Sequence, residues 1–190
     1  VASKSFGTGA SRESLLQLFR KYNLSPVFSP LEQHGEDLDE FDGIIIGTSK
    51  ITRELLIGSK RLRAIIKYGV GIDNIDVEAA KEKGIKVLNL PGINAQAVAE
   101  LALGLMFAVS RKIAWGDRSV RSGKWEGLIG ASLVGKTLGI IGTGAIGCNL
   151  VHLASGLQMQ VLGYDIAQNP AFLEAGGQYV NLETLLATSD

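Results

Sequence analysis

Short apolar runs alternate with helix-length amphipathic segments through the first half of the chain. Apolar runs bounded by polar or glycine-rich stretches predict three buried strands, at Gly43–Ile46, Ala64–Lys67 and Lys86–Leu88. Apolar positions with helical spacing predict helices at Ser11–Tyr22, Thr52–Ser59 and Val77–Lys83. Because strands and helices alternate, we expect a parallel sheet covered by helices.

A second alternation of the same kind begins at Lys136. It predicts strands at Thr137–Ile141, Gln160–Tyr164 and Gln178–Val180. The helices predicted after these strands are Ala145–Gly156, Pro170–Ala175 and Leu182–Ala187. The predicted fold class is therefore α/β, in two separate parts with a boundary near residues 91–95.

A longer helix is predicted between the two alternations, at Ala95–Lys112. It is apolar on nearly all sides, so we expect it to be buried between layers. A polar stretch with two tryptophans, Trp115 and Trp125, follows it. This stretch is either a surface segment or arm that reaches another subunit, or a loop that caps its own domain.

Composition narrows the function classes. The 190 residues are 46% hydrophobic and 20% charged, which is typical of one or two globular domains and not of a disordered chain. The formal net charge is zero, and basic residues never run beyond two in a row, so we expect neither a nucleic-acid nor a membrane partner. The longest apolar stretch, Ala95–Val109, is too short for a membrane span.

The cysteine content and the chain ends bear on location. The single cysteine, Cys148, excludes an internal disulfide and favours the cytoplasm, and the first residues lack the apolar core of a signal peptide. The chain starts at Val1 without an initiator methionine and stops at Asp190 just after a short helical pattern. We therefore expect it to be part of a longer protein.

The candidate chemistry lies in a glycine-rich turn of the second alternation. Gly142, Gly144 and Gly147 have the G-x-G-x-x-G spacing, follow an apolar strand and open a helix. The next predicted strand ends at Asp165, 18 residues after Gly147. In such a unit the first glycine permits the tight turn, the second lets the backbone approach a pyrophosphate, and the third permits close helix packing. Helix N–H groups without internal partners then meet the phosphate charge.

Asp165 also predicts which dinucleotide binds. Its carboxylate can accept hydrogen bonds from both ribose hydroxyls and would repel a 2′-phosphate, and Ile166 offers no compensating cation. We therefore predict NAD as the cofactor. The alternative is a glycine-rich packing turn in an unrelated α/β protein, such as a methyltransferase.

With these residues in view, the whole chain resembles the D-isomer-specific 2-hydroxyacid dehydrogenases, most closely those that act on D-3-phosphoglycerate. The matching segments, in the family's order, are Gly69–Asp76 (GVGIDNID), Asn94–Glu100 (NAQAVAE), Gly123–Glu126 (GKWE), Gly135–Gly147 (GKTLGIIGTGAIG) and Tyr164-Asp165. The resemblance implies a flavodoxin-like substrate domain at residues 1–93, without its C-terminal return segment. It also implies a truncated Rossmann-type NAD domain at 94–190, an active site in the cleft between the domains, and a homodimer through the nucleotide domain.

The resemblance assigns roles to four residues outside the glycine turn. Val70 and Gly71 match the loop whose backbone N–H groups hold the substrate carboxylate, with Val70 also beside the cofactor; an ordinary turn after a strand is the alternative. Asn94 matches a polar residue that faces substrate and nicotinamide, although asparagine is also a good N-cap. Lys67 matches a basic position near the substrate, whereas its place at a strand end favours a solvated lysine.

The cofactor residues implied by the resemblance surround the glycine turn. They are Gly142, Gly144, Ala145, Ile146, Gly147, Asp165 and Val70. The sequence departs from many members at Ala145, where they carry an arginine beside the pyrophosphate. Backbone contacts to the phosphates do not depend on that arginine.

The family's hydride step uses an arginine, an acidic residue and a histidine, all of which lie after the region where this sequence stops. We therefore expect no catalytic residue within the segment, which alone should be inactive. His34, in a polar loop, and His152, on the helix after the glycine turn, are not expected to substitute. Cys148 and His152 are four residues apart, but two ligands do not make a zinc site, so we expect no metal. Cys148 is expected to be a small core residue.

Two sets of acidic residues are expected to be structural. Glu100 lies within an apolar helix, where a paired or hydrogen-bonded role is expected. Asp73 and Asp76 flank a turn and could cap the helix that follows.

The sequence and the resemblance thus predict part of an NAD-dependent oxidoreductase that acts on the CH–OH group of a small 2-hydroxy acid. The expected substrate is 3-phosphoglycerate, in serine biosynthesis. A dehydrogenase for glyoxylate, lactate or formate is one alternative. A non-catalytic NAD-sensing protein, like the corepressor relatives of the family, is the other.

Overall fold

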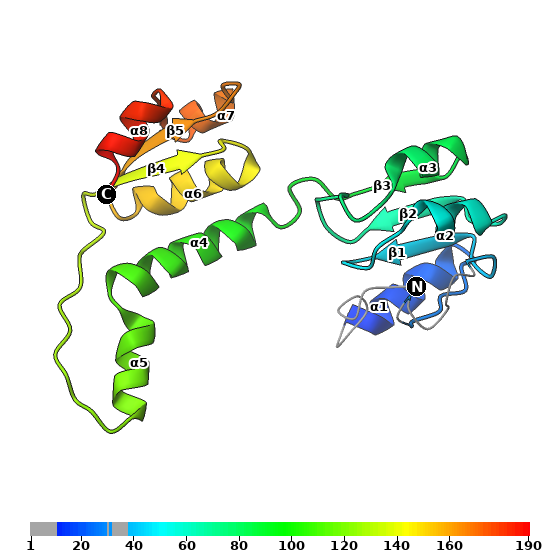
Figure 1. The fold of residues 1–190 in the computed structure, drawn as a ribbon, viewed down its shortest axis with the longest axis horizontal. Coiled ribbons are helices and arrows are strands. Elements are labelled where there is room, and N and C mark those ends of the chain that lie inside the picture. Colours follow the sequence, from blue (N-terminus) through cyan, green and yellow to red (C-terminus); the bar gives the residue numbers. More distant parts are fainter. Residues whose placement is uncertain (1–10, 30, 32–37) are drawn as a thin grey trace. The chain divides into compact units, whose positions relative to one another are not determined.

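The computed structural model describes residues 11–29, 31 and 38–190. The prediction for His34 lies outside these residues. The chain divides into two compact units, Val1–Ile93 and Asn94–Asp190. Each unit holds a three-stranded parallel sheet with helices packed against it (Figure 1).

The sheet of the first unit has the order β1-β2-β3. Its strands are β1 (Gly43–Ile46), β2 (Ala64–Lys67) and β3 (Lys86–Leu88), and its helices are α1 (Ser11–Lys21), α2 (Arg53–Gly58) and α3 (Val77–Glu82). The core forms where Ile44 and Ile46 of β1 and Ile65 of β2 meet Leu56 of α2. All four are almost fully buried, because both faces of a helix-covered parallel sheet are shielded from water.

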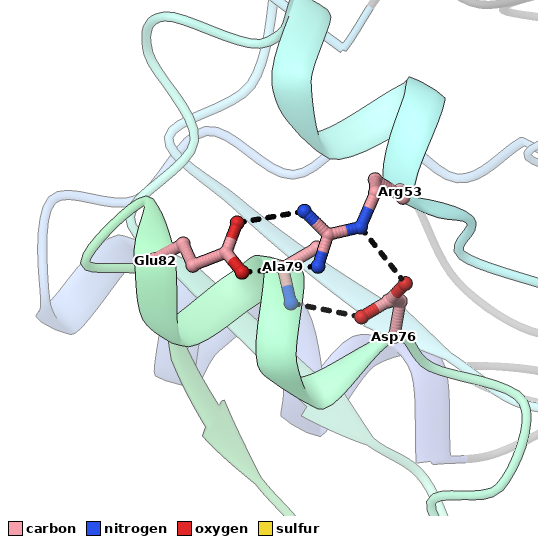
Figure 2. Close-up of polar contacts among 4 residues, drawn as sticks. All are labelled: Arg53, Asp76, Ala79 and Glu82. Atoms are coloured by element: carbon pink, nitrogen blue, oxygen red, sulfur yellow. Dashed lines mark hydrogen bonds and ion pairs between the residues drawn. The ribbon is translucent and has the colours of Figure 1, made fainter.

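The start of α3 is held by a cluster of charges (Figure 2). Asp76 caps the helix, as expected, by accepting a hydrogen bond from the Ala79 N–H at 2.8 Å. The Arg53 guanidinium of α2 pairs with the same aspartate at 3.7 Å and with Glu82 at 2.7 Å. One arginine thereby joins α2 to both ends of α3. The structure shows no capping bond from Asp73.

The sheet of the second unit has the order β4-β5-β6. Its strands are β4 (Thr137–Ile141), β5 (Gln160–Tyr164) and β6 (Gln178–Tyr179), and its helices are α4 (Ala95–Ser110), α5 (Ile113–Arg121), α6 (Ala145–Ser155), α7 (Pro170–Glu174) and α8 (Leu182–Thr188). In Figure 1, α6 and α8 lie on opposite sides of β4. Neighbouring residues of β4 show why: a Cβ on Gly139 would meet Leu185 of α8, whereas Ile140 lies against Gly147 of α6.

Phe172 of α7 fills the space between α7 and the sheet and is completely buried. A Cβ atom on Gly163 or Gly177 would lie 2.5 Å or 2.3 Å from its ring. Two glycines therefore make room for one aromatic side chain, which in turn packs on Tyr179 with ring centroids 5.2 Å apart.

The long apolar helix, expected to be buried between layers, is buried along one side only within this chain. Ala95 and Ala99 of α4 are buried, and Ala102 and Leu103 pack against the α6 core. The side chains of Leu101, Leu105 and Val109 are 61%, 56% and 78% exposed within this chain. Four-residue spacing places these three on one stripe of the helix, away from the α6 contact.

The polar stretch with two tryptophans begins with a helix that the sequence pattern did not predict, α5. Lys112 adopts a left-handed conformation (φ +54°), which separates α5 from α4. Within α5, Arg121 pairs with Asp117 at 2.8 Å, four residues earlier, and this pair stabilises the helix. Residues 122–136 follow without helix or strand, and Trp125 there is 92% exposed. No helix in the described parts of the chain has both the length and the apolar character needed to cross a membrane.

Candidate cofactor and substrate sites

The glycine turn between β4 and α6 has the geometry of an anion cradle. Gly142 has a positive φ of +96°, which favours glycine, and its N–H donates to the Tyr164 oxygen at 2.9 Å. Gly144 is the N-cap of α6, and nothing lies within 4 Å of the place where its Cβ would be. The first N–H groups of this 11-residue helix therefore open onto free space at the positive end of the helix dipole.

Gly147 has a different role from the other two glycines. A Cβ atom there would lie 2.7 Å from the Gly142 backbone oxygen, a distance that real Cβ atoms do not adopt. The glycine thus permits the first turn of α6 to lie directly against the loop that it opens. Ala145 and Ile146, between the glycines, are exposed.

Asp165 follows β5 and is held firmly in place. Its Oδ2 accepts from the Thr143 N–H at 2.7 Å and the Thr143 hydroxyl at 3.2 Å, and its Oδ1 accepts from the Ile166 N–H at 2.7 Å. The Thr143 N–H, followed by that of Ile166, lowers the pKa of Asp165 below its usual value because both donors favour the charged form. The carboxylate is therefore an ionised acceptor beside the glycine turn, and the next side chain, Ile166, is 98% exposed and uncharged.

The sequence pattern did not single out three residues that support this aspartate. Thr143 is completely buried within the glycine turn, and its hydroxyl is hydrogen-bonded to the Tyr179 hydroxyl. Asn169 donates from its side chain to the Thr143 oxygen at 2.8 Å and from its backbone to the Tyr179 hydroxyl at 2.8 Å. The polar character of Thr143 inside an apolar turn was the one available signal, since buried hydroxyls need partners.

Cys148 and His152 show no arrangement for chemistry. Cys148 is partly buried against the core of the second unit, and burial raises the pKa of its thiol. Its sulfur lies 3.6 Å from the Thr143 oxygen and 3.4 Å from the Asn169 amide nitrogen. His152 is exposed on α6. Among the described residues, no three His, Cys, Asp or Glu side chains gather as metal ligands would.

The loop after β2 carries the predicted substrate residues of the first unit. Gly69 has a φ of +151°, and its oxygen accepts from the Leu90 N–H at 3.0 Å. The Val70 oxygen accepts from the Asn89 amide at 2.7 Å, while the Val70 side chain is exposed. A Cβ on Gly71 would lie 2.9 Å from Asp73 Oδ1, the end of a side chain that can rotate away. The loop is thus tethered through its carbonyl groups at the carboxyl end of β2.

Lys67 is not the solvated lysine that the sequence favoured. Its ammonium is half-buried and donates to the Gly47 oxygen at 2.7 Å and to Asn74 Oδ1 at 2.6 Å. Asn74 in turn donates to the Gly47 and Ser49 oxygens at 3.2 and 2.6 Å. Lys67 and Asn74 therefore join the loop after β1 to the loop after β2.

Asn94 and Glu100 both belong to α4 of the second unit. Asn94 occupies the N-cap position, but its exposed side chain makes no capping hydrogen bond, which leaves its amide available. Glu100 accepts from the Gln96 amide at 2.9 Å, in agreement with a hydrogen-bonded role. The predicted site residues thus form two sets: Lys67, Val70 and Gly71 in the first unit, and Asn94 with the glycine turn and Asp165 in the second.

Known proteins match this chain over almost its whole length. The model of the D-isomer specific 2-hydroxyacid dehydrogenase catalytic domain matches residues 8–188. A hydroxypyruvate reductase of Thermotoga maritima is 45% identical over 184 residues, which are 94% of this chain and 60% of that protein. A D-3-phosphoglycerate dehydrogenase of Archaeoglobus fulgidus is 39% identical over 186 residues, 96% of this chain and 32% of that protein.

Solved structures agree with this similarity. A D-lactate dehydrogenase from Aquifex aeolicus, complexed with NAD and lactic acid, matches with a TM-score of 0.81 at 28% identity. The match covers 97% of this chain and 57% of that one. The chain thus spans between about a third and three fifths of the length of these relatives.

Proposed function

This chain belongs to the family of D-isomer specific 2-hydroxyacid dehydrogenases, and on that premise we propose that it serves an NAD-dependent oxidoreductase acting on the CH–OH group of a small 2-hydroxy acid. NAD is the cofactor that the family uses. The observation that carries the proposal is the pairing of an open glycine turn with an ionised, firmly held carboxylate, Asp165. That pair fits a dinucleotide: helix N–H groups for the pyrophosphate and an acceptor for the adenosine ribose.

The residues of the second unit would hold NAD in a defined way. Gly144, with free space where a side chain would be, would let the backbone approach the pyrophosphate, and Ala145 and Ile146 would contribute the first N–H groups of α6. Asp165 would accept from the ribose hydroxyls and disfavour a 2′-phosphate. When bound, NAD supplies the hydride acceptor for oxidation at the substrate C2 atom.

We assign the substrate carboxylate to the loop after β2. The Val70 and Gly71 N–H groups are suited to an anion because the loop is anchored through its carbonyl groups, which leaves N–H groups to donate. The free amide of Asn94 would hydrogen-bond to the substrate. In this assignment residues 1–93 form the substrate domain and residues 94–190 the NAD domain.

The candidate substrates, 3-phosphoglycerate on one side and hydroxypyruvate or glyoxylate on the other, are supported by different relatives and by different interpretations of the Lys67 hydrogen bonds. 3-Phosphoglycerate is supported by the 39% identity to the Archaeoglobus dehydrogenase and by the ammonium of Lys67, which has three donors and uses two internally. Hydroxypyruvate or glyoxylate is favoured by the same two hydrogen bonds. A lysine that is bonded to two loops is not free to move toward the phosphate of a substrate. The 45% identity to the Thermotoga reductase points the same way.

We also propose a homodimer through the NAD domain. Leu101, Leu105 and Val109 form an exposed apolar stripe on α4, and Trp125 is exposed on the segment after α5. A row of exposed apolar side chains on one helix is typical of a protein–protein interface.

The test is coenzyme binding by the purified chain, measured by calorimetry with NAD and with NADP. We expect one NAD site per chain and at least tenfold weaker binding of NADP. Equal binding of the two, or none of NAD, would contradict the proposal. In the full-length protein, initial rates with 3-phosphoglycerate, hydroxypyruvate and glyoxylate then identify the substrate.

A further inference from the structure

Thr143 connects Asp165 to a buried chain of hydrogen bonds. The residue has no exposed surface, and its hydroxyl contacts two groups, Asp165 Oδ2 at 3.2 Å and the hydroxyl of Tyr179. The Tyr179 hydroxyl in turn accepts from the Asn169 backbone N–H at 2.8 Å. Four residues from the glycine turn, the end of β5, the start of α7 and β6 thus meet in one line.

Chemistry fixes the direction of every bond in this line. An ionised carboxylate can only accept, so the Thr143 hydroxyl must donate its proton to Asp165. The Thr143 oxygen is then an acceptor toward Tyr179, whose hydroxyl proton points to it. A backbone N–H can only donate, so Tyr179 accepts from Asn169. The line therefore runs from Asn169 through Tyr179 and Thr143 to Asp165, with each hydroxyl both accepting and donating.

The far end of the line is rigid. The Tyr179 ring packs on the fully buried Phe172 at 5.2 Å between centroids. The Asn169 amide donates to the Thr143 backbone oxygen at 2.8 Å, and its Oδ1 accepts from the Ala171 N–H at 3.1 Å. Because these contacts already fix the Tyr179 hydroxyl, it can orient the Thr143 hydroxyl at little further entropic cost.

Resting on the NAD site proposed above, we propose that Tyr179 is a positioning residue for adenosine recognition. Its hydroxyl orients the Thr143 hydroxyl, and Thr143 fixes Oδ2 of Asp165 from inside the protein. The rotation of the carboxylate is thereby set before the coenzyme arrives, and binding of the ribose does not have to order it. A tyrosine of β6 thus contributes to coenzyme affinity without touching the coenzyme.

The test combines two variants in the full chain. Tyr179→Phe removes the hydroxyl and keeps the ring on Phe172, and Thr143→Val removes the next hydroxyl at nearly constant shape. We expect Tyr179→Phe to raise the Kd for NAD about three- to tenfold, the effect of one lost hydrogen bond. The double variant should bind no more weakly than Thr143→Val alone, because Tyr179 acts only through Thr143. Tyr22→Phe, on an exposed tyrosine of the first unit, is the matched control and should leave the Kd unchanged.

A second measurement does not depend on NAD. Carboxyl-carbon NMR titration should show a higher Asp165 pKa in Tyr179→Phe than in the wild type, and no change in Tyr22→Phe. If wild-type protein fails to bind NAD, the proposed cofactor site is wrong, and this titration still decides whether Tyr179 controls the carboxylate. An unchanged titration in Tyr179→Phe, or strictly additive losses in the double variant, would overturn the inference. Thr143→Ser keeps the hydroxyl and is the substitute variant if Thr143→Val folds poorly. We expect it to have the wild-type Kd for NAD and the wild-type pKa of Asp165.

Discussion

The Gly142 backbone oxygen lies 2.7 Å from the place where a Cβ atom on Gly147 would be. The oxygen belongs to backbone and cannot rotate away, so a larger residue at position 147 must push α6 off its loop. That displacement would reach the N–H groups proposed to bind pyrophosphate.

We therefore expect Gly147→Ala to lower the free energy of unfolding by about 1–3 kcal/mol, as overpacking does, and to weaken NAD binding at least tenfold. Gly156→Ala, at the other end of α6, is the control, because a Cβ there meets its nearest neighbour at an ordinary 3.5 Å. Thermal unfolding and calorimetry would measure both effects. If the two variants had the same stability and the same affinity for NAD, the contact between position 147 and the Gly142 oxygen would be relieved by a small shift, and the prediction would be wrong.

Coenzyme choice should change with two adjacent residues. Asp165→Ser removes the charge that opposes a 2′-phosphate, and Ile166→Arg places a cation on a fully exposed neighbour. The double variant should lose NAD affinity and gain NADP affinity, each by about 10- to 100-fold, the effect of one charge-assisted hydrogen bond. Ile166→Gln with Asp165 intact is the control and should keep the preference for NAD. A double variant that still prefers NAD would place the coenzyme ribose elsewhere.

The cluster in Figure 2 predicts a pH dependence of stability. The hydrogen bond from Arg53, and then its charge, lower the pKa of Glu82 below its ordinary value of 4.5. The contribution of this pair is therefore complete above pH 4.5 and is lost as the pH falls through the lower, folded-state pKa. The difference in unfolding free energy between wild type and Glu82→Gln should be constant near neutral pH and vanish in acid. Glu78→Gln, on the same helix, is the control; a difference that persisted in acid would exclude the ion pair as its source.

Most elements could be predicted from the sequence because their signals are local. The expected bounds are confirmed for five strands, β1 to β5. Short apolar runs between glycines and polar residues are typical of the buried strands of a helix-covered parallel sheet. α5 was missed because three of its four apolar residues are consecutive, and because a lysine in a left-handed conformation separates it from α4. The left-handed conformation of Lys112 cannot be predicted from the pattern of apolar and polar residues.

The candidate site could be predicted only where a motif marks it. The glycines and Asp165 have a fixed spacing, whereas Tyr179 and Asn169 reach Thr143 through tertiary folding. The internal bonds of Lys67 likewise depend on Gly47 and Asn74, which lie on separate loops. For α4, an apolar pattern indicated burial but could not indicate that the chain's own residues cover only one side.

Lys67 variants separate a substrate-binding role from a positioning role. Lys67→Met removes two hydrogen bonds that join the loops after β1 and β2. If Lys67 positions the loops, kcat/KM should fall by a similar factor, about tenfold or more, for 3-phosphoglycerate and for hydroxypyruvate. A fall confined to the phosphorylated substrate would instead show direct contact with the phosphate. Lys60→Met, an exposed lysine of the same unit, is the control for the lost charge.

The proposed dimer depends on the α4 stripe. Leu105→Glu places a charge at its centre, and a charge buried in an apolar interface without a partner is strongly unfavourable. Sedimentation velocity should therefore show a dimer for the wild type and a monomer for Leu105→Glu. Glu100→Gln, on the same helix, should remain dimeric. A wild-type monomer at micromolar concentration would disprove the assembly.

The packing of Phe172 between two glycines limits the order in which this domain can change during evolution. The three atoms nearest to a Cβ on Gly177 all belong to the Phe172 ring, so replacing the ring by a smaller side chain removes the three closest contacts that an alanine would make there. The same step does not free Gly163, where a Cβ would still lie 2.9 Å from Thr143. A lineage that loses the aromatic ring can thus drift at position 177 while position 163 stays fixed. Restoring the phenylalanine afterwards would first require the glycine at 177 to return.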